Sequence, residues 1–166
     1  IGILKAIDSA GLKIDYITGT SMGAIVGALY AVGYSGNDIE KIGREIDWDQ
    51  LFGNQISFQT LSMEEKEQYS RFAIELPYVN NKIKLQTGVI KGQELNLKFA
   101  ELFFHVSDVR RFDQFRIPFK CMATDLETGN LVVLDTGNIT TALRATMAIP
   151  SIFSAVSVGD KKLVDG

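Results

Sequence analysis

Ser21 stands at the centre of a Gly-x-Ser-x-Gly pattern, with Gly19 before it and Gly23 after it. The pattern follows an apolar segment with strand character at 14–18 and precedes a helical run of small residues at 22–32. A sharp strand-to-helix turn exposes the side chain of its central residue, and the two glycines remove bulk beside it. The sequence therefore predicts that Ser21 is a nucleophile. The alternative is a glycine-rich turn that only enters a buried helix.

A serine hydroxyl needs a base before it can attack a carbonyl carbon. Asp165 follows an apolar pair and precedes Gly166, which predicts a carboxylate at a strand end, where open α/β sheets place their sites. The alternative for Asp165 is a surface Asp-Gly turn. Asp125 has a similar position and is the competing base. The one histidine, His105, ends an amphipathic segment and is interpreted as a rim or surface residue, although a Ser–His enzyme would require it.

Composition limits the classes of protein to consider. The chain has 166 residues, of which 46% are hydrophobic and 22% charged, which suits one globular domain without an apolar run of the roughly 20 residues that a membrane span needs. The net charge of −3 argues against nucleic-acid binding. One cysteine and one histidine cannot form a usual zinc site, so no metal site is predicted, and Cys121 is expected in the core. Four cationic residues lie close together in the sequence: Arg110, Arg111, Arg116 and Lys120. This cluster predicts a solvated face, and the alternative is contact with an anionic lipid surface.

Strand and helix patterns alternate along the chain, which predicts an α/β fold. We expect a three-layer sandwich in which a central, mostly parallel or mixed sheet is covered by helices on both faces. The expected helices span residues 1–10, 22–32, a segment capped by Ser35, a short segment capped by Ser62, 93–105 and 139–147. The expected strands span 14–18, 118–124, 131–135, 155–158 and 162–164, with a projecting hairpin at 72–78 and 82–87.

Four motifs occur in a fixed order. They are Gly-Thr-Ser-Met-Gly within 15–34, Ile-Pro-Phe-Lys-Cys-Met-Ala-Thr-Asp-Leu-Glu-Thr at 117–128, Arg-Ala-Thr-Met-Ala-Ile-Pro-Ser-Ile-Phe at 144–153 and Leu-Val-Asp-Gly at 163–166. Together they resemble the patatin-like phospholipases, most closely the bacterial branch of that family. The resemblance runs nearly from end to end and is weakest at 47–87, where substrate preference is expected to be set. It implies a single patatin-like domain over 1–166 that is truncated at both ends.

The resemblance also implies a chemistry. The family's nucleophile falls on Ser21 and its base on Asp165, which implies a Ser–Asp dyad that cleaves fatty acyl esters of phospholipids or related lipids through an acyl-enzyme, without a cofactor. This is a carboxylic ester hydrolase of phospholipase A or lysophospholipase type, with a lipid or membrane surface as its substrate. The Met22 backbone N–H is expected to be one donor to the oxyanion.

The chain departs from the family at its start. In the family, the other oxyanion donors come from a glycine-rich loop before the first helix, and this chain begins after that point. We therefore expect a fragment that catalyses poorly. The alternative function is a non-catalytic lipid-binding or interaction module that retains the fold. Related bacterial proteins are cytoplasmic or exported to the outer membrane, and the sequence selects neither location nor an oligomeric state.

Overall fold

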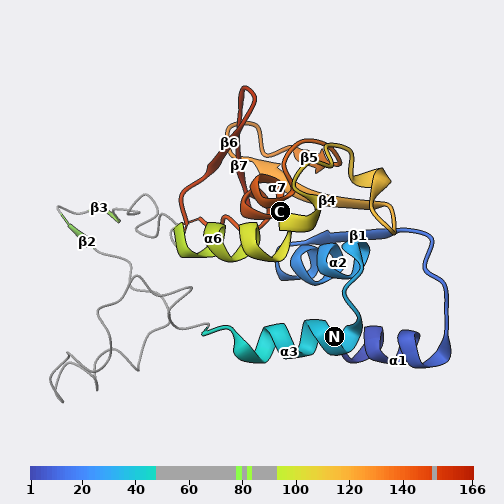
Figure 1. The fold of residues 1–166 in the computed structure, drawn as a ribbon. Coiled ribbons are helices and arrows are strands. Elements are labelled where there is room, and N and C mark those ends of the chain that lie inside the picture. The colour runs from blue at the N-terminus through green and yellow to red at the C-terminus, as the bar shows by residue number, and fades with distance from the viewer. Residues whose placement is uncertain (48–77, 80–81, 84–92, 151–152) are drawn as a thin grey trace, which may run out of the picture.

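A computed structural model describes residues 1–47, 78–79, 82–83, 93–150 and 153–166 (Figure 1). The described part of the chain contains helices, strands and two short 3₁₀ segments. In chain order they are α1 (Gly2–Ala10), β1 (Ile17–Thr20), α2 (Met22–Val32), α3 (Gly36–Glu45), β2 (Tyr78–Val79), β3 (Lys82–Ile83), α6 (Gln93–Leu102), η1 (Phe104–Val106), η2 (Phe112–Gln114), β4 (Phe119–Asp125), β5 (Leu131–Leu134), α7 (Ile139–Thr146), β6 (Val156–Val158) and β7 (Lys161–Val164).

The main sheet is mixed and has β4 at its centre. Its strand order is β1-β4-β7-β6, and β5 also pairs with β4. The β1 strand runs parallel to β4, whereas β5 and β7 are antiparallel to β4 and β6 is antiparallel to β7. This arrangement confirms the predicted α/β class with a mixed sheet.

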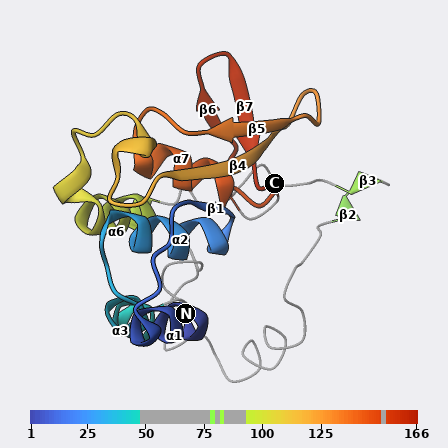
Figure 2. The same ribbon diagram turned by 90° about the vertical axis from the view of Figure 1, so that its right-hand side faces the viewer.

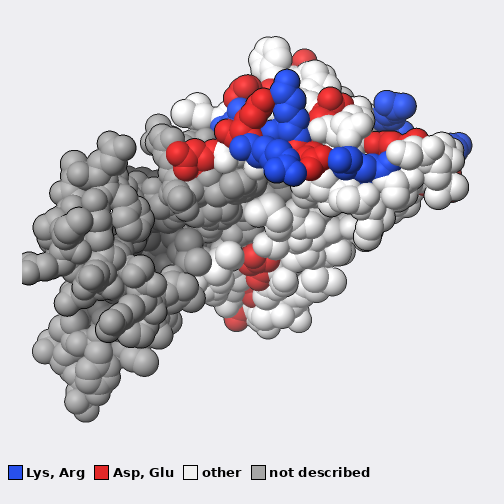
Figure 3. Space-filling view, turned by 90° about the horizontal axis from the view of Figure 1, so that it is seen from below, with Lys and Arg blue, Asp and Glu red and all other residues white. Residues whose placement is uncertain are grey.

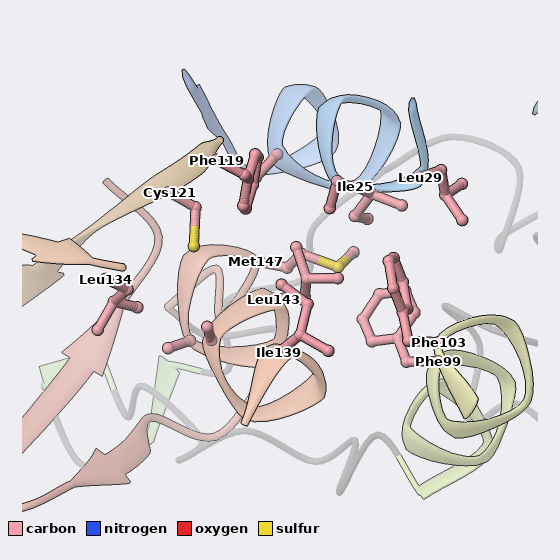
Figure 4. Close-up of a cluster of buried hydrophobic side chains, with 14 of the residues drawn as sticks. Ile25, Leu29, Phe99, Phe103, Phe119, Cys121, Leu134, Ile139, Leu143 and Met147 are labelled. Carbon is pink, nitrogen blue, oxygen red and sulfur yellow. The ribbon is translucent and has the colours of Figure 1, made fainter. Parts of the chain in front are cut away.

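The core lies between one face of β4 and three helices. Phe119 and Cys121 of β4 point toward Leu143 of α7 and toward α2, and two aromatic side chains, Phe99 of α6 and Phe103 just after it, close the cluster (Figure 4). A Cβ added at Gly27 of α2 would lie 2.9 Å from Ile17 Cγ2, so the small residues of α2 let this helix lie close to the sheet, as predicted. The expected helical layer on the other sheet face stays a prediction, because the described helices that contact β4 pack on this one.

Helices α1 and α3 form a further layer beneath α2 (Figures 1 and 2). Ser35 and Asp38 form a capping box at the start of α3, which confirms the predicted cap. A Cβ at Gly36 would lie 2.6 Å from the Lys5 backbone nitrogen, so glycine permits the close crossing of α1 and α3. Lys5 of α1 and Glu40 of α3 form an ion pair across this crossing, and Figure 3 shows cationic and anionic side chains intermingled when the molecule is seen from below.

Two boundaries differ from the sequence-based prediction by three residues, and the other shifts among the described elements are smaller. The β1 strand begins at Ile17 instead of residue 14, because the Ile17 N–H donates to the carbonyl of Pro118 and proline has no N–H with which to extend the ladder. The α6 helix ends at Leu102, whose carbonyl accepts the Tyr34 hydroxyl, and the chain continues as η1. The antiparallel pair β2–β3 confirms the hairpin, whereas its turn, the Ser62 helix and most of 47–87 lie outside the described residues.

Candidate functional site

Ser21 occupies a strained turn between β1 and α2. Its backbone has φ 53° and ψ −131°, and among the described residues it is the one non-glycine residue with a positive φ. A Cβ at Gly19 would lie 2.7 Å from the backbone of Ala24, so the turn requires glycine there. A Cβ at Gly23 would meet no heavy atom of the described residues within 4 Å. Crowding among the described residues therefore explains why Gly19 must be a glycine, whereas the same residues leave space for a side chain at Gly23.

Strand pairing explains how Ser21 meets a residue 144 positions away. The β5 strand pairs with Cys121–Thr124 of β4, so β1 and β7 must both lie along the opposite edge of β4. There β1 ends with Thr20 opposite Met122, while β7 approaches from the other direction and ends with Val164 opposite Thr124. The two strands therefore end head to head across from Ala123, and the next residue of each is a member of the predicted dyad.

The structure joins the two predicted site residues directly. The Ser21 hydroxyl donates a hydrogen bond to Asp165 Oδ2, with an Oγ to Oδ2 distance of 2.6 Å. Both side chains are half-buried. The Asp165 N–H donates to the Ala148 carbonyl at 3.0 Å, which ties the Asp165 backbone to the segment just after α7, and a Cβ at Gly166 would lie 3.3 Å from Ala123 Cα. A short, direct contact between a hydroxyl and a carboxylate is the geometry that proton transfer requires.

Thr146 is a site residue that sequence reasoning missed. The Ser21 N–H donates to Thr146 Oγ1 at 2.9 Å, and the Thr146 hydroxyl donates in turn to the Met122 carbonyl. Thr146 is the last residue of α7 and its side chain is fully buried. The available signal was a polar residue within the apolar, buried stretch that follows Arg144.

Met22, the predicted oxyanion donor, is the first residue of α2. Its N–H belongs to the first turn, where amide groups have no acceptor within the helix, and the positive end of the helix dipole lies at the same place. Met22 is 42% exposed, as expected for a residue at the open side of the turn. This end of α2 is suited to stabilising negative charge beside Ser21.

The two competing bases lie elsewhere. Asp125 is buried, and its carboxylate accepts the Glu127 N–H and the Thr128 hydroxyl, so it holds the turn between β4 and β5. His105 is exposed, with its ring 5.7 Å from that of Tyr34, which follows the far end of α2. Since α2 has 11 residues, about 16 Å of helix separates that end from Ser21. Neither residue is brought to the Ser21 hydroxyl.

The structure also bears on the predictions for Cys121, the cationic cluster, metal sites and membrane-spanning helices. Cys121 is buried in the core, as expected, and burial raises the pKa of its thiol to about 12. In the cationic cluster, Arg111 pairs with Asp113 and Lys120 pairs with Asp135, which supports the solvated-face interpretation. The described residues include no group of three or more His, Cys, Asp or Glu side chains that could hold a metal ion. Within the same residues, no helix has the length and apolar character needed to cross a membrane.

Known proteins match this chain over almost its whole length. The family model described as "Patatin-like phospholipase" matches residues 1–166. The uncharacterized protein YqhO of Bacillus subtilis is 26% identical and aligns with 99% of this chain and 57% of its own length. Lysophospholipase NTE1 of Debaryomyces hansenii is 25% identical, and the uncharacterized NTE family protein Mb1092c of Mycobacterium bovis is 24% identical; both align with 100% of this chain. The match covers 9% of the yeast protein and 38% of the mycobacterial one, so the chain spans less than two thirds of each of these relatives.

Proposed function

Because this chain belongs to the patatin-like phospholipase family, we propose that the protein that carries it is a serine hydrolase that cleaves fatty acyl esters of phospholipids or lysophospholipids. The observation that carries the proposal is the 2.6 Å hydrogen bond from the Ser21 hydroxyl to Asp165. The lysophospholipase named among the relatives supports the choice of a lipid ester as the substrate. In this proposal Ser21 is the nucleophile and Asp165 is the base.

Acylation begins when Ser21 Oγ attacks the ester carbonyl carbon and Asp165 accepts the hydroxyl proton. The carbonyl oxygen becomes an oxyanion, which the Met22 N–H and the N-terminal end of α2 stabilise. Collapse of this intermediate breaks the bond to the lipid alcohol, which leaves with the proton that Asp165 received. The products of this half-reaction are the free alcohol and an ester of Ser21 with the fatty acid.

Deacylation uses the same two residues with water in place of the lipid alcohol. Asp165 accepts a proton from a water molecule as the water oxygen attacks the acyl carbon. The second oxyanion collapses, the bond between Ser21 Oγ and the acyl carbon breaks, and Ser21 Oγ regains its proton from Asp165. The fatty acid is released and both residues return to their starting states, so the cycle needs no histidine.

The proposal is tested with the full-length protein and a fluorophosphonate probe that reacts with activated serines. We expect the probe to label Ser21, and we expect Ser21→Ala to abolish both labelling and hydrolysis of lysophosphatidylcholine. Asp165→Asn should lower the hydrolysis rate by about 10² to 10⁴, the usual contribution of a general base. Asp160→Asn is the matched control, because Asp160 is exposed in the turn that follows β6.

Each outcome separates the candidate functions. Loss of activity in Asp165→Asn with full activity in Asp160→Asn supports the dyad. Loss of activity in His105→Ala with full activity in Asp165→Asn would replace it with a Ser–His mechanism. A wild-type protein that binds lipid vesicles but neither reacts with the probe nor hydrolyses the lipid would indicate the non-catalytic lipid-binding module.

A further inference from the structure

We propose that Thr146 is a positioning residue that holds the Ser21 backbone in its strained conformation, and this inference rests on the proposed function of Ser21. The Thr146 hydroxyl bridges the Ser21 N–H and the Met122 carbonyl, so it connects the turn, strand β4 and the end of helix α7. Thr146 contacts the amide of the nucleophile and not its hydroxyl. Its effect on the reaction is therefore exerted through the position of Ser21.

The Thr146 side of the bridge is buried, and its hydroxyl is hydrogen-bonded in two directions. Thr146 has no exposed surface, and its neighbours Ala145 and Met147 are also buried. Its hydroxyl both accepts a hydrogen bond and donates one, which uses the donor and one acceptor site of the group. A side chain held in this way has one favourable orientation, so it defines where the Ser21 amide lies.

The need for such a bridge follows from the conformation of Ser21. A non-glycine residue at φ 53° persists only where its surroundings determine it. The Ser21 carbonyl accepts the N–H groups of Ala24 and Ile25 at the start of α2, which fixes one side of the residue. The bond from the Ser21 N–H to Thr146 fixes the other side.

The same α7 segment also positions the base. The Ala148 carbonyl, two residues after Thr146, accepts the N–H of Asp165. The last residue of α7 and the segment that follows it therefore hold the backbones of both dyad residues, the nucleophile through the Thr146 hydroxyl and the base through a main-chain bond from Ala148. Loss of the Thr146 hydroxyl should release Ser21 while Asp165 keeps its own support.

The test compares Thr146→Ser with Thr146→Ala in the full-length protein, because these two variants differ by a single oxygen atom. Thr146→Ser should keep the bridge and retain most of the fluorophosphonate labelling rate. Thr146→Ala should label about 10- to 100-fold more slowly, since a displacement of about 1 Å at a reacting atom can cost about 10²-fold in rate. With lysophosphatidylcholine we expect kcat to fall and KM to stay unchanged.

Two further variants make the comparison decisive. Thr141→Ala is the matched control, because Thr141 lies on the exposed side of α7 and should keep the wild-type rate. If Thr146→Ala does not fold, Thr146→Cys takes its place, because a thiol fills similar space but hydrogen-bonds weakly. Equal labelling rates in the serine variant and in the folded alanine or cysteine variant would overturn the inference. Absence of labelling in the wild type would instead contradict the proposed function itself.

Discussion

Replacing Ser21 with glycine is expected to give a more stable protein than replacing it with alanine. Both substitutions remove the hydroxyl and its hydrogen bond to Asp165, and both keep the N–H that donates to Thr146. The variants differ only in the Cβ atom, which alanine retains at φ 53° and ψ −131°. Glycine adopts a positive φ without the steric conflict between Cβ and the backbone.

The magnitude follows from two opposing contributions. A non-glycine residue in a sparsely populated backbone region costs about 1–3 kcal/mol, whereas glycine loses about 0.5–1 kcal/mol more conformational entropy on folding than alanine. Taken at the midpoints of these two ranges, about 2 and about 0.75 kcal/mol, the net advantage of Ser21→Gly over Ser21→Ala is about 1.25 kcal/mol. For a domain of this size, about 1 kcal/mol shifts the melting temperature by about 2–4 °C, so we expect a difference of about 2.5–5 °C.

Thermal unfolding of the two full-length variants, followed by calorimetry or circular dichroism at one pH and one protein concentration, measures this difference. Ser157→Gly and Ser157→Ala, at an exposed position in β6, provide the reference pair, in which glycine should be the less stable variant. A Ser21→Ala protein that melts at or above the temperature of Ser21→Gly would refute the conclusion that the turn stores strain at Ser21.

Three other measurements test the structure. Gly19→Ala should lower the melting temperature and abolish probe labelling, because its Cβ would lie 2.7 Å from backbone atoms. Gly23→Ala should melt at or slightly above the wild-type temperature, because its Cβ meets no heavy atom of the described residues within 4 Å and alanine loses less conformational entropy than glycine in a helix. Hydrogen bonds from Lys5 and Arg44 lower the pKa of Glu40 from 4.5 to about 2, so the stability that it contributes is present above pH 4.5 and is lost as the pH falls toward 2; melting temperatures of wild type and Glu40→Gln should differ at pH 7 and converge near pH 2. Iodoacetamide at pH 8 should leave Cys121 unmodified until the protein is unfolded, as peptide mass spectrometry can show, because burial raises its pKa to about 12.

Local patterns predicted most of the helices and strands correctly. The α2 helix was identified from its small residues, α3 from its capping residue Ser35, and the end of α7 from Pro150. The errors fall where a partner far away in the sequence decides the boundary. The start of β1 depends on Pro118 in the neighbouring strand, and the end of α6 lies where the hydroxyl of Tyr34 reaches the Leu102 carbonyl.

The candidate site, like the fold, has a part that local sequence patterns predicted and a part that only contacts between distant residues decide. Ser21 was selected because the Gly-x-Ser-x-Gly turn is a local pattern, and Asp165 because it follows a short strand. The sequence favoured Asp165, but Asp125 remained the competing base, since both aspartates end apolar segments. Its carboxylate is used by the Glu127 N–H and the Thr128 hydroxyl, which only the folded turn reveals.

The order of residues along the chain determines a serine in a sharp turn, a helix of small residues behind it and an acidic residue at the end of a strand, because each depends on neighbours within a few positions. Tertiary structure alone decides that β1 and β7 share one edge of β4 and end opposite Ala123, so that Ser21 reaches Asp165. It also decides that a buried threonine of α7 holds the Ser21 amide. Register between distant strands and contacts across the core depend on how the whole sheet assembles, which no short segment encodes.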